Sequence, residues 1–268
     1  MFDTIITSAV EHDSVMQAAP DANRIPVDSE GRVDLATLGE ILASLHDAAR
    51  SRTLVSVMTA NNETGVIQPV DEIVAIARVA GVAVHSDMAQ ALGKQHLDFT
   101  RSDLDFASLS AHKIGGPKGI GALAIAPGVM LVPQIRGGGQ EKYRRGGTEN
   151  VVGIAGFDAA AKRAEANMAR MADVAKMRDR LETELASEAP ELLIAGKGTE
   201  RLVNTSCLIL PGMPGETQVM ALDLAGVAIS SGSACSSGKV RESHVLKEMG
   251  VSDAGSAIRV SLGLETTD

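Results

Sequence analysis

Residues 108–123 read SLSAHKIGGPKGIGAL and place one lysine, Lys113, in a glycine-rich turn between two apolar runs. The apolar runs, residues 104–109 and 120–126, predict two strands joined by this turn. The glycines after Lys113 leave room for a ligand to come close to the backbone. An amine in such a turn suits a lysine that binds an aldehyde cofactor beside its phosphate. A surface lysine in an ordinary loop is the alternative, because short glycine-rich motifs often occur by chance.

Outward from this turn, the chain up to about residue 133 alternates short β-like runs with amphipathic segments. The alternation predicts an α/β fold with a mostly parallel sheet covered by helices. Residues 71–80 place apolar side chains on one helical face and stop at Gly81, and residues 82–87 follow as a buried strand that ends at Asp87. Because open α/β sheets bind ligands beyond the carboxyl ends of their strands, we expect functional residues directly after such runs.

The second part of the chain has a different pattern. Residues 151–189 are rich in alanine and interspersed charges, which predicts a long helix that Pro190 ends. Strand-like and helical segments then alternate in a way that predicts a smaller α+β unit. The sequence therefore predicts a large domain over residues 1–165 and a small C-terminal domain over residues 166–268.

The composition excludes several classes of protein. A net charge of -9 and an aromatic content of 2% argue against a nucleic-acid surface, which needs basic stripes and stacking side chains. The two cysteines cannot form a disulfide framework, the N-terminus lacks the pattern of a signal peptide, and no apolar stretch is long enough to cross a bilayer. We therefore expect a globular cytoplasmic protein with no nucleic-acid or membrane partner.

Several polar residues after strand-like runs suit a cofactor of the pyridoxal phosphate type. Such a cofactor needs an acid at its ring nitrogen, a donor to its phenolic oxygen, a flat group against its ring and a phosphate cradle. Asp87 suits the ring nitrogen, and Gln90 lies on the same side if a helical turn follows. His12 can stack on a ring and move protons, and Asn61 or Asn62 can donate to a ring oxygen. The structural alternatives are a helix cap for Asp87, a turn for the asparagines and a structural role for His12.

Further candidates lie in the second half of the chain. Thr148, in RRGGTEN, offers a hydroxyl for phosphate, although the motif equally fits a plain turn. Arg259 can bind a substrate carboxylate in a bidentate pair or form a surface ion pair instead. Cys235, in SSGSACSSG, is predicted in an exposed polar loop and is a plausible nucleophile, whereas Cys207, in LVNTSCLIL, is predicted to be buried. Neither cysteine has the close spacing of a metal site, so no metal site is predicted.

Short motifs occur in one order almost from end to end of the chain: EHDSV, NNETG, HSDMAQ, SAHKIGGPKGIG, RRGGTEN, SSGSACSSG and AIRVSLG. Together they resemble the cysteine desulfurases of the NifS and IscS type, which belong to the class V aminotransferases. The resemblance implies a homodimeric fold-type I enzyme that depends on pyridoxal phosphate. It also implies conversion of L-cysteine to L-alanine, with the sulfur passed to an acceptor or scaffold protein for iron–sulfur cluster or thio-cofactor assembly.

The resemblance implies a role for each matching residue. Lys113 matches the Schiff-base lysine, His12 the histidine stacked on the ring, and Asp87 the partner of the ring nitrogen. Cys235 matches the cysteine that becomes a persulfide and that can transiently bind an iron–sulfur species. The remaining matches are to binding residues: Arg259 and Asn62 for the substrate, Asn62 and Gln90 at the phenolic oxygen, Ser110 and His112 at the phosphate, and Thr148 at the phosphate of the neighbouring subunit.

The family also extends before the position that matches Met1. The resemblance implies that this extension holds further ligands for the phosphate, at a helix N-terminus, and for the substrate carboxylate. One alternative to an active desulfurase is therefore an inactive fragment that keeps the site residues but cannot hold the cofactor. Another is a related class V enzyme, such as a selenocysteine lyase or an aminotransferase. Gly146 stands where many relatives have serine.

Overall fold

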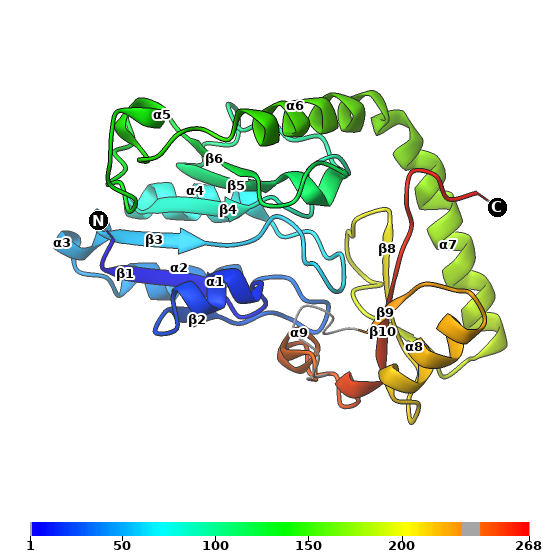
Figure 1. Cartoon of the computed structure of the whole chain (residues 1–268). Helices are drawn as coiled ribbons and strands as arrows, with labels where there is room; N and C mark the ends of the chain where they lie inside the picture. The colour runs from blue at the N-terminus through cyan, green and yellow to red at the C-terminus, as the bar shows by residue number, and fades with distance from the viewer. Residues whose placement is uncertain (1, 232–241, 268) are drawn as a thin grey trace.

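The computed structural model describes residues 2–231 and 242–267, which fold around two β-sheets (Figure 1). The helices α6 (Val151–Ala166) and α7 (Met171–Glu188) connect the sheets. Cys235 lies outside the described residues. Every helix among the residues described is too short or too polar to cross a membrane.

The first sheet has six strands in the order β2-β1-β3-β4-β5-β6. Neighbouring strands of this sheet run parallel, with one exception. Strands β5 and β6, which lie on either side of the glycine-rich turn, pair antiparallel. The prediction of a mostly parallel sheet in an α/β fold is confirmed. The strands are β1 (Thr4–Ser8), β2 (Asn23–Ile25), β3 (Thr53–Ser56), β4 (Ala83–Asp87), β5 (Phe106–Ser110) and β6 (Gly121–Ile125).

The apolar face of this sheet packs against α2 (Leu35–Ala43) and α4 (Val70–Ala80). Ile73, Val74 and Ala77 of α4 are buried in the same cluster as Val84 of β4, which explains the apolar spacing read from the sequence. The helix ends where predicted, because Gly81 adopts a left-handed φ of 70° that other residues rarely tolerate. Short helices α1 (Asp13–Ala18) and α3 (Asp47–Arg50) complete this part.

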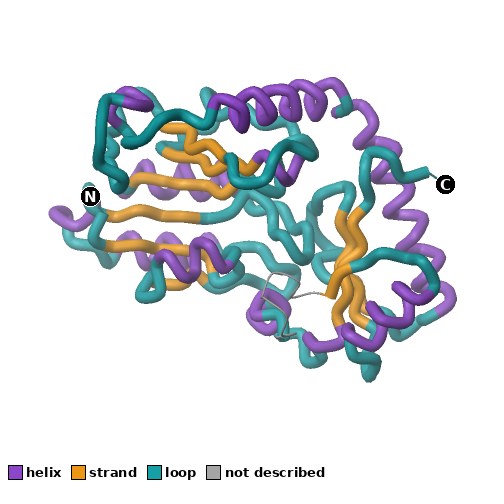
Figure 2. The backbone as a smooth tube through the Cα atoms, in the orientation of Figure 1, coloured by secondary structure: helices purple, strands orange, loops and turns teal. Residues whose placement is uncertain are grey.

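The prediction of a single long helix over residues 151–189 is wrong, because the chain bends between α6 and α7 (Figure 2). The turn η2 (Met168–Arg170) separates the helices. At the end of α6, the side-chain amide of Asn167 donates to the carbonyl of Arg163 at 2.7 Å. Asparagine competes in this way with the helical hydrogen bonds, and the alanine-rich pattern alone did not reveal the break.

The second sheet has four antiparallel strands in the order β7-β8-β10-β9. Its strands are β7 (Leu193–Ile194), β8 (Thr205–Ile209), β9 (Ser230–Ser231) and β10 (Ala257–Ser261). The first sheet lies within residues 1–165 and the second within residues 166–268, while the division into two domains stays a prediction. The remaining elements are η1 (Ala111–Ile114), α5 (Gln140–Tyr143), α8 (Gly215–Leu224), α9 (His244–Glu248) and η3 (Ala254–Ser256).

A buried ion pair attaches α7 to the second sheet. The guanidinium of Arg201 donates to both carboxylate oxygens of Glu182, at 2.8 and 2.9 Å, and the side chains are only 5% and 8% exposed. The hydroxyl of Ser206, on β8, donates to the same carboxylate at 2.7 Å. The pair is therefore nearly buried, and three hydrogen bonds join its carboxylate to Arg201 and Ser206.

Glu182→Ala is expected to lower the free energy of unfolding by about 3–5 kcal/mol, because it leaves the Arg201 charge buried without a partner. Urea unfolding followed by circular dichroism measures the change. Glu184→Ala, which removes an exposed carboxylate of the same helix, is the matched control and should cost less than about 1 kcal/mol. An equal cost for the two variants would contradict the assigned role of the buried pair.

Candidate active site

A cavity of ≈ 290 Å³ lies at the carboxyl ends of β4 and β5, the place where the sequence predicted functional residues. It is lined by most of the residues singled out in the sequence, although they come from separate segments of the chain. These are His12, Asn62, Asp87, Gln90, Ser110, His112 and Lys113. The cavity therefore brings together an amine, a carboxylate, imidazoles, amides and a hydroxyl.

Lys113 is part of the short turn η1, which follows β5 directly. Among the described residues it forms no hydrogen bond or ion pair, so its amine is available to a ligand. The glycines after it serve the turn itself: Gly115 has a φ of 81°, and a Cβ at Gly116 would lie 2.9 Å from the carbonyl oxygen of Ala111. The glycines thus let this turn close and hold Lys113 at the cavity, and their predicted role of leaving room for a ligand stays a prediction.

Asp87 and Gln90 lie on the same side, as predicted for a helical turn after β4. One oxygen of the Asp87 carboxylate accepts a hydrogen bond from the backbone N–H of Ala89 at 2.9 Å. The alternative that Asp87 caps the next helix is wrong, because β5 is the next described element after β4. The hydrogen bond to Ala89 closes a turn instead, and the carboxylate lines the cavity. Structural and chemical roles are combined in one side chain.

His12 also combines two roles. It is the N-cap of α1, where its Nδ1 accepts a hydrogen bond from the backbone N–H of Ser14 at 3.1 Å. In the neutral imidazole the proton is then on Nε2. His12 lines the cavity with this tautomer fixed by the cap.

The structure distinguishes the two asparagines of NNETG. The amide of Asn61 is buried and used within the loop, where it donates to the carbonyl of Val10 at 3.0 Å and accepts from the N–H of Glu63 at 2.9 Å. Asn62 instead lines the cavity. Of the two, only Asn62 remains a candidate for ligand binding.

Arg259 reaches the NNETG loop from β10 of the second sheet. Its Nη1 donates to the backbone carbonyl of Asn62 at 2.6 Å, and its Nη2 makes a long contact of 3.4 Å with the hydroxyl of Ser230. Its Nε is buried and has no partner among the described residues. Nε and Nη2 form the edge through which an arginine binds a carboxylate by two parallel hydrogen bonds, and Nε has no other partner among the described residues.

The other predicted residues have different surroundings. The hydroxyl of Ser110 and Nδ1 of His112 are 2.9 Å apart, and both residues line the cavity. Thr148 is exposed and is not among the residues that line it. A Cβ at Gly146 would lie 2.7 Å from the backbone of Arg136, so glycine fits this close approach of two backbone segments. Cys207 is fully buried, as predicted, and burial raises the pKa of its thiol to about 12.

Sequence reasoning missed three titratable groups around the cavity. Burial, followed by the charges of Lys113 and Arg259, lowers the pKa of Lys94 to about 8. Burial raises the pKa of Glu63 to about 7, although Ser243 donates to its carboxylate. Burial also raises the pKa of Glu11 to about 8. Only Lys94 had a detectable signal, since it follows Gln90 by four residues in the predicted helical turn.

Glu11 is completely buried beside the cavity. One carboxylate oxygen accepts hydrogen bonds from the hydroxyl of Ser8 at 2.5 Å and from the N–H of Met58 at 2.9 Å. The other oxygen has no partner among the described residues. A nearby Asp87 adds to the rise in the pKa of Glu11 that burial causes, so the carboxyl holds a proton near neutral pH.

Glu11→Gln is expected to flatten the pH dependence of stability. The pKa of Glu11 is about 8 in the folded chain, compared with 4.5 for an unperturbed glutamate. The folded state therefore binds more protons than the unfolded state between these pH values, and stability falls as the pH rises. The variant should therefore be stabilised relative to the parent by about 2–4 kcal/mol more at pH 8 than at pH 5. Urea unfolding between pH 5 and pH 8 measures the stability difference between variant and parent, and Glu191→Gln, which changes an exposed glutamate, is the control. If the stabilities of Glu11→Gln and the parent ran parallel with pH, the prediction would be contradicted.

The described residues contain no group of three or more His, Cys, Asp or Glu side chains arranged to hold a metal ion. Most groups in the cavity are donors of hydrogen bonds or protons. The arrangement can bind an anionic ligand, hold a carbonyl group through an amine and move protons beside it.

Comparison with known proteins supplies the family. The chain matches aminotransferase class-V over residues 2–268. It is 41% identical to a cysteine desulfurase of Cereibacter sphaeroides, over 98% of this chain and 68% of that protein. It is 38% identical to the cysteine desulfurase NifS of Azotobacter vinelandii, over 99% of this chain and 67% of that protein. It resembles the crystal structure of a NifS-like protein from Rickettsia africae with a TM-score of 0.89 and 37% identity, over 98% of this chain and 71% of that one. The chain belongs to the class V aminotransferase family.

Proposed function

We propose that this chain is a cysteine desulfurase that depends on pyridoxal phosphate and converts L-cysteine to L-alanine, leaving the sulfur as a persulfide on Cys235. The names of its relatives support the reaction. The observation that carries the proposal is the guanidinium of Arg259: its Nε has no partner among the described residues, and its Nη1 donates to the carbonyl of Asn62, which lines the cavity with Lys113 and Asp87. That combination suits an amino-acid substrate whose carboxylate is bound by arginine.

The residues of the cavity fit pyridoxal phosphate by their chemistry. Lys113 supplies the amine that would hold its aldehyde, Asp87 a carboxylate for its ring nitrogen, and His12 a flat imidazole for its ring. Ser110 and His112 would bind its phosphate, and Asn62 and Gln90 its phenolic oxygen. When bound, the cofactor supplies an electron sink that stabilises negative charge at the Cα atom of the substrate.

The residues of this chain would then bind, orient and move protons. Arg259 holds the substrate carboxylate, and the free amine of Lys113 removes the proton from Cα. Asp87 keeps the ring nitrogen protonated, and His12, with its proton on Nε2, can pass a proton to a neighbouring group. The thiolate of Cys235 attacks the substrate sulfur: an S–S bond forms, the C–S bond breaks, and its electron pair stays with the carbon product, which is protonated to alanine.

The proposal includes the assembly and location of the enzyme. Thr148 is exposed and outside the cavity of its own chain, so we assign it to the phosphate of a second copy in a homodimer. The large domain over residues 1–165 would hold the cofactor, and the small domain over residues 166–268 would supply Arg259 and Cys235. The sulfur would pass to an acceptor or iron–sulfur scaffold protein in the cytoplasm.

The test begins with purified protein and added pyridoxal phosphate. A visible absorbance should appear, and borohydride should trap the cofactor on Lys113, which mass spectrometry of the digested protein detects. L-cysteine should then give alanine and sulfane sulfur in equal amounts. A colourless protein without trapped cofactor would favour the inactive fragment, and a clear preference for selenocysteine over cysteine would favour a selenocysteine lyase.

Arg259→Gln is expected to lower kcat/KM for L-cysteine roughly 10- to 100-fold, mainly through KM, because a charge-assisted hydrogen bond of about 1.5–3 kcal/mol is lost. Steady-state alanine formation measures the effect. Arg101→Gln, which removes an exposed arginine, is the control. An unchanged KM for Arg259→Gln would contradict the assignment of the substrate carboxylate.

A further inference from the structure

The turn that follows β4 joins Gln90 to a lysine that the predicted chemistry does not use. Nζ of Lys94 donates a hydrogen bond to Oε1 of Gln90 at 3.1 Å. Backbone hydrogen bonds from Leu92 to Met88 and from Lys94 to Ala91, both 3.0 Å, hold the turn that places the residues four positions apart on one side. A lysine ammonium can only donate, so the amide of Gln90 must direct its oxygen to Lys94.

The orientation of the Gln90 amide decides what it offers to the cavity. With its oxygen held by Lys94, its Nε2 group is left to donate toward other ligands. Gln90 lines the ≈ 290 Å³ cavity together with Asp87 and Lys113. We propose that Lys94 is a positioning residue, which turns the Gln90 amide so that its N–H groups donate into the cavity toward the phenolic oxygen of the cofactor. This inference rests on the proposed function.

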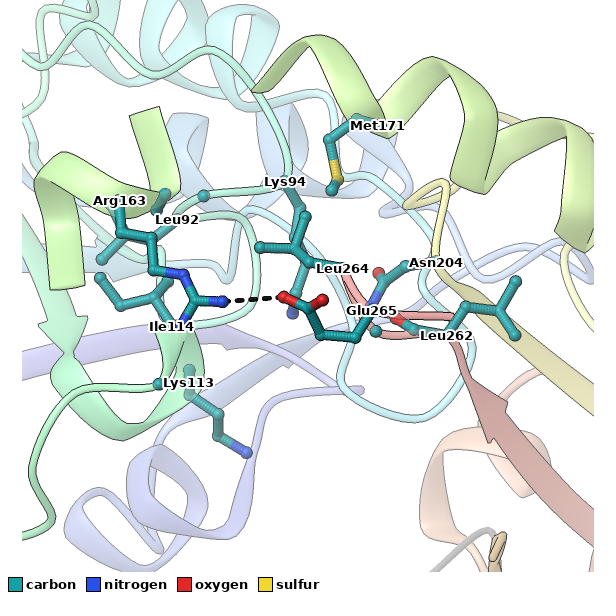
Figure 3. A pocket seen from close by; sticks show the side chains of 14 residues that line it. Leu92, Lys94, Lys113, Ile114, Arg163, Met171, Asn204, Leu262, Leu264 and Glu265 are labelled. Atoms are coloured by element: carbon teal, nitrogen blue, oxygen red, sulfur yellow. Dashed lines mark hydrogen bonds and ion pairs between the residues drawn. The ribbon is translucent and has the colours of Figure 1, made fainter. Parts of the chain in front are cut away.

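Lys94 lies where its charge has no carboxylate partner among the described residues. It lines a second cavity of ≈ 250 Å³, to which Lys113 also contributes and whose walls are largely apolar (Figure 3). Two further charged side chains of this cavity, Arg163 and Glu265, pair with each other at 2.8 Å. Lys113 and Arg259 repel the Lys94 charge. Among the described residues, the hydrogen bond to Gln90 is therefore the contact that holds the ammonium in place.

The position of Lys94 is also fixed by its backbone. Gly93 has a φ of 72°, and a Cβ there would lie 2.9 Å from Cβ of Ala164 on α6 and 3.0 Å from Cγ2 of Ile114 on η1. The turn is thus wedged between the helix and the segment that carries Lys113. A rigid base of this kind lets a long side chain orient its neighbour.

The test uses the protein loaded with pyridoxal phosphate and measures the apparent pKa of its visible chromophore. A donor to the phenolic oxygen stabilises its ionised form, so Lys94→Met should raise this pKa by about one pH unit, whereas Lys94→Arg keeps a cationic donor and should stay close to the parent. In a Gln90→Ala background, Lys94→Met should cause no further shift. Lys162→Met, an exposed lysine of α6, is the matched control.

A second readout needs no cofactor. In ¹⁵N-labelled apo protein, the side-chain amide signals of Gln90, identified by their loss in Gln90→Ala, should shift in Lys94→Met and return toward the parent in Lys94→Arg. If these signals shift but no variant forms a chromophore, the proposed function fails and the positioning contact stands. Two results for Lys94→Met would each overturn the inference: unchanged Gln90 signals, or a chromophore pKa equal to that of the parent. If Lys94→Met does not fold, both measurements are repeated with Lys94→Gln.

Discussion

Lys113→Ala is expected to reduce alanine formation from L-cysteine by about 10⁴-fold or more, because one amine both holds the cofactor and moves the Cα proton. The structure leaves this amine without a partner among the described residues and places it on η1, between the two cavities. Single-turnover and steady-state assays of alanine measure the loss, and the visible absorbance reports the loss of covalent binding.

The matched control lies in the same glycine-rich stretch. Lys118 is exposed and does not line the cavity, so Lys118→Ala should keep the parent rate and absorbance. If Lys113→Ala retained the covalent chromophore, or if both variants lost activity equally, the amine that serves the reaction would have to be another one. Lys94 is the first candidate, because it shares a cavity with Lys113 and burial lowers its pKa.

Local patterns predicted much of the fold because the residues that decide it are close in sequence. Helix α4 ends at Gly81 because the left-handed conformation is a property of that residue, and Asp87 reaches the edge of the sheet because its strand ends there. The break at Asn167 was missed, since its side chain interrupts a pattern that alanine otherwise continues.

The site could be predicted only in part, because its electrostatics depend on contacts between distant segments. The guanidinium of Arg259 is held by the hydrogen bond from its Nη1 to the carbonyl of Asn62, 197 residues away in sequence. The raised pKa of Glu11 depends on how the first sheet buries it. Motif order predicts which residue types are present, but burial and long-range pairing decide how each one ionises.

The two cysteines differ in how well their thiols can act as nucleophiles, although both occur in serine-containing motifs. Cys207 is fully buried in β8 and the pKa of its thiol is raised to about 12, so it stays protonated and does not act as a nucleophile. The proposed persulfide therefore belongs to Cys235, for which the argument rests on sequence, since this residue lies outside the described part of the chain.

Cys235→Ala is expected to lower sulfur release from L-cysteine by roughly 10³-fold or more, because removal of a nucleophile removes the covalent step. Cofactor absorbance should remain, since Cys235 has no assigned part in holding it. Mass spectrometry of the parent after reaction with L-cysteine should show one added sulfur atom on the peptide that carries Cys235.

The matched control is Cys207→Ala. This variant should retain the rate while losing on the order of 1 kcal/mol of stability from the vacated core volume. Unchanged sulfur release by Cys235→Ala would exclude the persulfide route, and retained activity on selenocysteine alone would assign the chain to selenium chemistry, in which no protein thiol has to accept the leaving atom.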